Sequence, residues 1–120
     1  MGILWHQGES DSHRIEDVEL YRDRFMNMIT SVINDLCLPK NIPIIIGELV
    51  EFVGEYDGGK CKYYKEINII LRKLSDELLY GGFVSSKGLS CKNDGIHFNS
   101  KSYREFGKRY FEVYLKTVKK

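Results

Sequence analysis

The stretch "PIIIGEL", residues 43–49, decides the fold class of this 120-residue chain. Its three consecutive isoleucines are β-branched, and no polar residue interrupts them. A continuous apolar run of this kind is typical of a strand buried on both faces, as in a parallel sheet. The sequence on either side is therefore expected to supply helices that cover those faces.

Apolar residues recur at spacings of three and four on both sides of this strand. They predict one amphipathic helix over Ile15–Leu36 and a second over Tyr64–Leu78. Short apolar runs at residues 2–5 ("GILW") and 81–86 ("GGFVSS") predict two further strands. The Gly-rich stretch 54–60 ("GEYDGGK") predicts a loop.

A last helix is predicted to begin near Ser100 or Ser102, where Ser102-x-x-Glu105 resembles a capping box. The resulting order β-α-β-α-β-α predicts an α/β fold, a three-layer sandwich around a parallel sheet, with residues 1–120 forming a single domain. About three strands are few for this class. We therefore expect the sheet to be incomplete and the chain to be the carboxyl-terminal part of a longer fold.

Composition narrows the classes of partner. The formal net charge is +1, so no overall field attracts nucleic acid or anionic lipid. No apolar run approaches the ~20 residues that span a bilayer, and the amino terminus lacks the basic and apolar regions of a signal peptide. We expect neither a nucleic-acid nor a membrane partner.

The three cysteines, Cys37, Cys61 and Cys91, are far apart and include no C-x-x-C pair. This spacing favours reduced thiols in a reducing compartment such as the cytoplasm. It does not favour a zinc site, and the remaining donors, including His6 and His13, do not converge in the sequence; no metal is expected.

Polar residues follow the first and third predicted strands. "HQGESDS" (6–12) comes after the first strand, and "KNDGIHF" (92–98) follows the third. Because ligands of parallel α/β sheets bind outside the carboxyl ends of the strands, both segments should open on one edge of the sheet. This placement predicts a shared site.

His97 and Asp94 are the first candidates for chemistry. The imidazole has an ordinary pKa of about 6.5, so it can take up and return protons near neutral pH. A carboxylate three residues earlier can hold the ring N–H and stabilise the imidazolium. The alternative is an aspartate that caps a turn beside a half-buried histidine.

Gln7 and Glu9 are the next candidates. The amide of Gln7 offers N–H donors that could bind a developing oxyanion, unless it is simply a solvated loop residue. Glu9 could act as an additional acid near the histidine, or could pair with an arginine such as Arg22. His6 and His13 are expected to be packing or surface residues, and Trp5 to lie in the core.

The sequence also offers weaker candidates for a nucleophile. "GESDS" (8–12) nearly matches the G-x-S-x-G elbow, but its final glycine is replaced by Ser12, so Ser10 reads better as a loop or capping residue. Nothing marks Ser85 or Ser86 as activated. Cys91 is close to His97 in sequence, which does not establish a Cys–His pair.

Two of these segments together resemble a known family. "GILWHQGESD" (2–11), followed far downstream by "DGIHFNSKSYREFGKRYFE" (94–112), resembles the SGNH/GDSL-type carbohydrate esterases. The similarity is greatest to the sialate O-acetylesterase and acetylxylan esterase-like group. The resemblance spans nearly the whole chain and implies an SGNH hydrolase-like, flavodoxin-like three-layer fold.

The resemblance implies hydrolysis of acetyl esters on carbohydrates by a serine nucleophile. By motif match, His97 would be the general base, Asp94 its orienting acid and Gln7 an oxyanion donor. Some members of the family use the glutamate at the position of Glu9 as an acid. The resemblance implies an acetylated carbohydrate as substrate and no metal or organic cofactor.

One part of the family pattern has no counterpart in this sequence. The family's serine lies in an early G-Q-S-N-like block that precedes "WHQGE", and this block is not found here. We therefore expect the nucleophile-bearing block to be missing and this chain alone to have little activity. Alternatives are takeover by another serine such as Ser10, a catalytically inactive relative that binds a carbohydrate or a partner, or one half of a complementing two-chain esterase. The expected protein partners are a second copy, in an oligomer, or a complementing amino-terminal chain.

Overall fold

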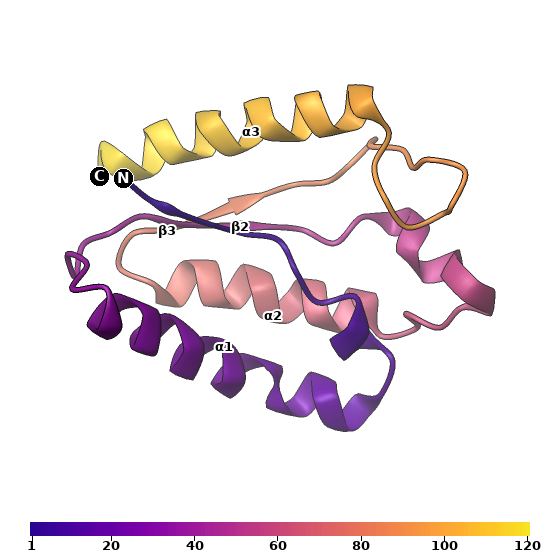
Figure 1. Ribbon diagram of the computed structural model, residues 1–120, viewed down its shortest axis with the longest axis horizontal. Coiled ribbons are helices and arrows are strands. Elements are labelled where there is room, and N and C mark those ends of the chain that lie inside the picture. Colours follow the sequence, from indigo (N-terminus) through magenta and orange to yellow (C-terminus); the bar gives the residue numbers. More distant parts are fainter.

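The computed structural model describes all residues from Met1 to Lys120 as three parallel strands between two layers of helices (Figure 1). The strands lie in the order β1-β2-β3, and both neighbouring pairs are parallel. Their bounds are β1 Ile3–Trp5, β2 Ile44–Gly47 and β3 Gly81–Val84. These strands confirm the predicted α/β class and the parallel sheet of three strands.

Helices cover both faces of the sheet. Helices α1 and α2 lie on one face, and α3 lies on the other (Figure 1). Two short 3₁₀ helices, η1 and η2, follow the first two strands. The bounds of the helices are η1 Ser10–Ser12, α1 Ile15–Asp35, η2 Glu51–Gly58, α2 Tyr64–Glu77 and α3 Ser100–Val118.

The central strand behaves as its sequence predicts. Ile45 and Ile46 are 0% exposed, and Ile44 is 4% exposed, so β2 is buried on both faces. Ile67 and Leu71 of α2 are also fully buried. Burying such a side chain contributes roughly 1.5–3 kcal/mol, so this layered contact is the main source of stability at the centre of the fold.

The start of α3 differs from the predicted capping box. The N-cap is Asn99, whose side-chain oxygen accepts the N–H of Ser102 at 2.9 Å. The hydroxyl of Ser102 is buried and instead accepts the N–H of Ser90 at 2.9 Å. Ser102 cannot serve both contacts, so the cap moves to the residue that precedes the helix.

The Gly-rich stretch 54–60 also differs from the prediction. Its first part belongs to η2, which begins at Glu51, but the chain leaves helical geometry from Tyr56 to Gly58, so the predicted loop is confirmed only there. Asp57 has a φ of 47°, in the left-handed region. Gly58 and Gly59 continue the left-handed turn, with φ of 68° and 87°. The glycines therefore end the 3₁₀ helix in a left-handed turn that is shorter than the predicted loop.

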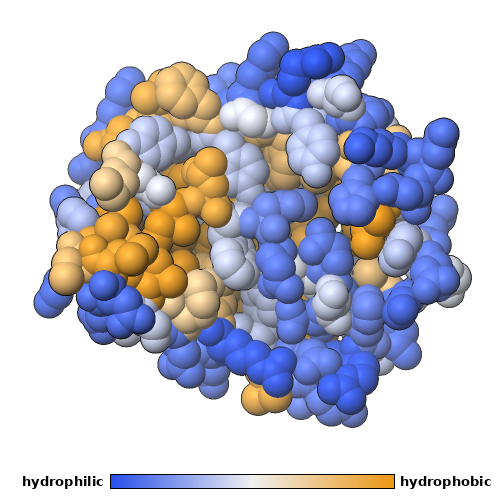
Figure 2. All heavy atoms as spheres, viewed as in Figure 1, coloured by the Kyte–Doolittle hydropathy of each residue, from blue (hydrophilic) through white to orange (hydrophobic).

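Strand β1 lies at an edge of the sheet and carries apolar side chains into solvent. Leu4 is 63% exposed, and Phe111 of α3 is 60% exposed. Both line an apolar groove of about 400 Å³ beside the strand. Apolar residues gather on the face seen in Figure 2, toward the end of the molecule where the termini lie.

Two general properties complete the fold. Cys37, Cys61 and Cys91 are free thiols. None of the helices combines the length and apolar character that crossing a bilayer requires.

Candidate active site

Asp94 and His97 form a hydrogen-bonded pair. The Oδ2 atom of Asp94 lies 2.7 Å from Nδ1 of His97. Its Oδ1 atom accepts the backbone N–H groups of Ile96 and His97, each at 3.0 Å. These contacts hold the pKa of Asp94 well below its usual range, with the backbone hydrogen bond from His97 as the largest cause. The carboxylate is therefore ionised at neutral pH.

This arrangement fixes the state of the imidazole. An ionised carboxylate only accepts hydrogen bonds, so Nδ1 of His97 carries the proton and Nε2 of the neutral ring presents a lone pair. No hydrogen bond of the structure occupies Nε2. The side chains of His97 and Asp94 are 63% and 45% exposed, so the pair is oriented but open to solvent.

The loop that carries the pair is tied at its base. The N–H of Asn99 donates to the carbonyl of Ser90 at 3.1 Å, and the N–H of Lys92 donates to the carbonyl of His97 at 2.7 Å. Between these bonds, Cys91 and Phe98 form an antiparallel bridge. These contacts close the base of the loop, so the Asp94–His97 pair lies on a constrained loop.

The segment after β1 is held from both faces of the sheet. The hydroxyl of Tyr110, on α3, donates to the carbonyl of Trp5 at 2.6 Å. The hydroxyl of Tyr21, on α1, donates to the carbonyl of Gln7 at 2.8 Å. Directly after Gln7, Gly8 has a φ of 148°, and a Cβ there would lie 2.8 Å from Ile67. The glycine thus lets the chain turn tightly against the core.

The two polar segments meet through aromatic contacts. The ring of His6 lies 5.6 Å from Phe98 and 5.3 Å from Phe106. Its Nε2 atom lies 3.3 Å from the carbonyl oxygen of Glu48. His6 is exposed overall, but desolvation of its ring by these neighbours is the largest cause of its lowered pKa. Gln7 follows His6 and His97 precedes Phe98, so both candidates lie on segments that share one edge of the sheet.

The side chain of Gln7 is directed toward a different neighbour. Its Nε2 atom donates to Oδ2 of Asp11 at 2.8 Å, and no hydrogen bond joins it to His97 or Asp94. Gln7 lines a hollow of about 220 Å³ on the side of α1. One amide N–H is engaged by Asp11, which leaves the second available.

Glu9 has a local role in the structure. Its Oε2 atom accepts the N–H of Gly8 at 3.1 Å, and its charge raises the pKa of His6 against the larger effect of burial. The predicted alternative of a pair with Arg22 is wrong, because Arg22 binds Glu77 of α2. The carboxylate of Glu9 therefore lies near His6 and has no arginine partner.

No serine hydroxyl is hydrogen-bonded to His97. Ser85 and Ser86 donate to Glu48, and Ser90 contacts Ser102 and Asn99. Ser10 is exposed at the start of η1 and makes no side-chain hydrogen bond to His97. Cys91 faces Phe98 across the bridge and is not bonded to His97.

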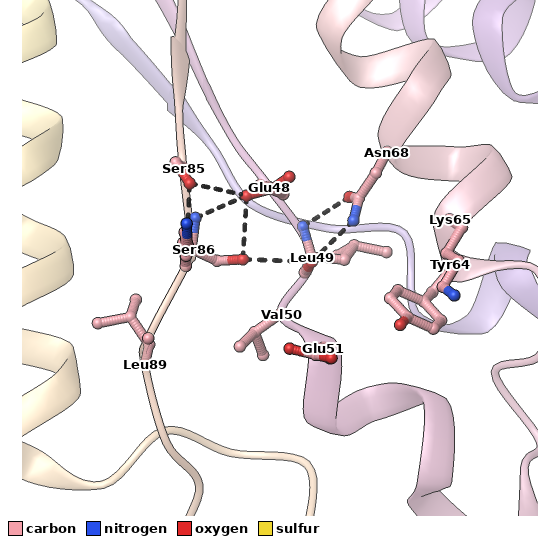
Figure 3. Close-up of a pocket in the computed structure, with 12 residues that line it drawn as sticks. Glu48, Leu49, Val50, Glu51, Tyr64, Lys65, Asn68, Ser85, Ser86 and Leu89 are labelled. Carbon is pink, nitrogen blue, oxygen red and sulfur yellow. Dashed lines mark hydrogen bonds between the residues drawn. The ribbon is translucent and has the colours of Figure 1, made fainter.

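Glu48 organises the ends of β2 and β3, a role that the residue pattern alone does not reveal. Its Oε2 atom accepts the N–H of Ser86 at 2.8 Å and the hydroxyl of Ser85 at 3.1 Å (Figure 3). On the next residue, the side chain of Asn68 holds both the N–H and the carbonyl of Leu49 at 2.8 Å. A single glutamate at the end of an apolar strand was the only sequence signal.

The same network fixes the start of the loop that leads to Asp94. Arg109 of α3 donates to the carbonyls of Ser85 and Lys87, both at 2.9 Å. A hollow of about 550 Å³ lies between this segment and the start of α2 (Figure 3). The polar groups drawn there mostly bind one another, so the network serves first to position the backbone.

Comparison with known proteins gives consistent similarities. Residues 1–116 match the family described as carbohydrate esterase, sialic acid-specific acetylesterase. A probable carbohydrate esterase of Arabidopsis thaliana is 32% identical over 113 residues, which are 94% of this chain and 39% of the relative. An X-ray structure of this same Arabidopsis thaliana protein superposes with a TM-score of 0.70 at 29% identity. It covers 96% of this chain, which spans 44% of that protein.

Proposed function

Because this chain belongs to the carbohydrate esterase family of sialic acid-specific acetylesterases, we propose that it acts in serine-type hydrolysis of acetyl esters on carbohydrates. The observation that carries the proposal is the Asp94–His97 pair, with its 2.7 Å contact and its unoccupied Nε2 atom. An oriented imidazole–carboxylate couple is the acid–base part of a hydrolytic triad. Its place on the loop before α3 matches the motif that the family resemblance implies.

In the proposed reaction, a serine hydroxyl attacks the acetyl carbonyl while Nε2 of His97 takes its proton. The imidazolium then returns this proton to the departing sugar oxygen, which leaves an acetyl-serine. Water attacks the acetyl-serine in the second step, and His97 again moves the proton. Asp94 keeps Nδ1 protonated and stabilises the positive ring.

Gln7 is the proposed oxyanion donor. One of its N–H groups is held by Asp11, which orients the amide, and the second is free to bind the negative oxygen. Glu9 remains an additional acid in this proposal, because its carboxylate acts on His6 at the same edge of the sheet. These groups cover every proton transfer, so the reaction as proposed requires no metal or organic cofactor.

The proposal places the nucleophilic serine on a segment outside these 120 residues. It is supported by the absence of a serine hydrogen bond to His97 and by the solvent-open state of the pair. The unpaired edge of β1 and its apolar groove are suited to a further strand, either from the same polypeptide or from a complementing amino-terminal chain. The Arabidopsis relative, which is the same protein in the sequence and structure comparisons, is more than twice as long as the matched segment.

A chimaera tests the proposal directly. Residues 1–116 replace the matched segment of the Arabidopsis carbohydrate esterase, and hydrolysis of p-nitrophenyl acetate and of an acetylated sugar is measured. We expect the folded chimaera to be active, its His97→Ala variant to lose activity, and the isolated chain to show little. A folded chimaera with equal rates before and after His97→Ala would remove His97 from the mechanism.

The second candidate function is a catalytically inactive relative that binds a carbohydrate or a protein partner. The apolar groove beside β1 favours it, because Leu4 and Phe111 are exposed there. Light scattering after size exclusion discriminates the protein-binding form, since a partner surface of this kind predicts self-association of the isolated chain. A monomer that also binds no sugar would argue against this candidate.

Two further points belong to the same proposal. The free thiols Cys37, Cys61 and Cys91 suit a reducing compartment such as the cytoplasm. Residues 1–120 are proposed as one domain or part of one, since α2 and α3 pack on a single sheet and α1 packs on α2.

A further inference from the structure

A hollow of about 600 Å³ lies next to the Asp94–His97 loop and is not used by the proposed reaction. The loop before α3 lies beside η2 at the carboxyl ends of the strands (Figure 1). The hollow has one wall from each of these segments. Its lining residues are Phe52, Glu55, Tyr56 and Asp57 from η2, with Cys91, Asp94 and Gly95 from the loop.

Both walls are fixed by the fold. Phe52 packs edge-to-face on Phe98 at 5.5 Å, and Phe98 is only 3% exposed. On the loop side, Cys91 is paired with Phe98 in the antiparallel bridge. Phe98 therefore contacts a residue of each wall, and this contact fixes the shape of the hollow.

The chemistry of the lining suits a sugar ring. Phe52 and Tyr56 are half-buried aromatic rings that offer flat apolar surface. Glu55 and Asp57 are exposed carboxylates that can accept hydrogen bonds from hydroxyl groups. Aromatic surface with a few polar groups is the usual composition of a small-molecule site.

The charge of the lining excludes one class of sugar. Glu55, Asp57 and Asp94 are three acidic residues that line the same hollow. The only cation paired with them is Lys60, whose Nζ atom lies 3.6 Å from Asp57. A sugar with its own carboxylate, such as sialic acid, would meet like charge there, and no lining residue would pair with it.

We propose that this hollow is a subsite for an uncharged sugar unit of a glycan, adjacent to the unit whose acetyl ester is hydrolysed. The inference rests on the proposed esterase function and specifies its substrate class as a neutral glycan. The acetylated unit faces Nε2 of His97, while the neighbouring unit lies on the side of Asp94 and stacks on Tyr56. Specificity in this chain then differs from the sialic acid named in the family description.

Binding to the 120-residue chain tests the subsite without any catalysis. Amide NMR spectra are recorded during titration with three neutral tetrasaccharides (xylotetraose, maltotetraose and tetra-N-acetylchitotetraose) and with anionic 3′-sialyllactose. We expect at least one neutral sugar to shift the amides of residues 55–58 and 91–95. We expect 3′-sialyllactose to bind about tenfold more weakly or not at all, because of like-charge repulsion.

Three variants make the test specific. Tyr56→Ala should weaken binding of the neutral sugar about fivefold or more through loss of the stacking surface. Glu55→Gln combined with Asp57→Asn should reduce the difference in binding affinity between neutral and sialylated sugars. Asn is tolerated at the left-handed φ of residue 57. Glu112→Gln, on the exposed side of α3, is the matched control and should change nothing.

Failure of the subsite and failure of the esterase proposal are distinguishable. The binding test needs no turnover, since the imidazole of His97 does not line the hollow. The subsite is overturned if no neutral sugar shifts these amides, if 3′-sialyllactose binds as tightly there, or if Tyr56→Ala binds like the unaltered chain. An inactive chimaera with intact sugar binding would instead overturn only the hydrolytic step.

Discussion

The imidazole of His6 lies 5.6 Å from the ring of Phe98, although 92 positions separate them in the chain. His6 stands next to Gln7, and Phe98 stands next to His97. This contact therefore brings the first and third strand segments together below the candidate active site. Phe106 of α3 completes the contact at 5.3 Å from His6. The packing of one titratable ring thus influences the loop that holds the proposed general base.

The first prediction concerns the effect of His6 on stability as the pH changes. Desolvation of its packed ring lowers the pKa of His6 from its usual value of 6.5, so the unfolded chain takes up a proton before the folded chain does. The residue as a whole is exposed, so solvent screens this effect and the change in stability should be small. The contribution of His6 to the free energy of unfolding is then complete above about pH 6.5 and is lost as the pH falls through the folded pKa. His6→Phe keeps an aromatic ring and removes the titration.

Urea denaturation of both proteins between about pH 5 and about pH 7.5 checks this prediction. The unaltered chain should lose more stability toward acid than His6→Phe does. All other titrating groups are common to the two proteins, so the difference isolates His6. Parallel pH profiles would contradict the prediction.

The second prediction concerns Tyr110. Its hydroxyl donates to the carbonyl of Trp5 at 2.6 Å, and the side chain is only 9% exposed. Tyr110→Phe leaves that carbonyl without its donor and should lower the free energy of unfolding by about 1–2 kcal/mol. Tyr103→Phe is the matched control, because Tyr103 is 52% exposed and donates no hydrogen bond, so its loss should be negligible.

Gly47 explains why this tyrosine reaches the end of β1. A Cβ at position 47 would overlap the Tyr110 hydroxyl and lie 3.0 Å from the ring of His6. Gly47→Ala should therefore lower the free energy of unfolding by about 1–3 kcal/mol, because the added methyl group overpacks the core. When Gly47→Ala and Tyr110→Phe are combined, the loss should be smaller than the sum, since one variant removes an atom that clashes in the other. Strict additivity in denaturation experiments would contradict this coupling.

The third prediction concerns Asn99, which closes the candidate loop and begins α3. Its side chain accepts the N–H of Ser102 at 2.9 Å and donates to the hydroxyl of Ser90 at 2.8 Å. Asn99→Ala should lower the free energy of unfolding by about 1 kcal/mol, and it should make the loop before α3 more mobile. The readout is the denaturation midpoint together with the sharpness of the His97 amide resonance. Ser100→Ala, at an exposed neighbouring position, should preserve both.

The sequence predicted the sheet because its signal was unambiguous. The isoleucines of β2 can be satisfied only by burial on both faces, and the spacing of Ile67, Leu71 and Leu74 leaves one buried side on α2. The ends of elements were less predictable. Ser102 has the residue type and spacing of a cap, but a long-range bond to Ser90 claims its hydroxyl. Such competition is not visible in local sequence.

In the candidate site, too, local contacts could be predicted from the sequence and long-range contacts could not. The spacing of Asp94 and His97 is local, so their hydrogen bond could be anticipated from four residues of sequence. The partners of Gln7 and Glu48 depend on how distant segments fold together. The hollow beside η2 depends on a packing contact between Phe52 and Phe98, which sequence spacing does not encode.

The last prediction separates the orienting role of Asp94 from its role in holding the loop. Asp94→Asn keeps an oxygen that can accept the N–H groups of Ile96 and His97, so the loop should keep its shape. The neutral amide cannot stabilise an imidazolium, and it can present an N–H to Nδ1 and favour the wrong tautomer of His97. In the active chimaera, kcat should fall about 10⁴-fold with little change in KM. Glu112→Gln serves as the charge-matched control, and an Asp94→Asn chimaera that is folded and fully active would show that this carboxylate does not orient the base.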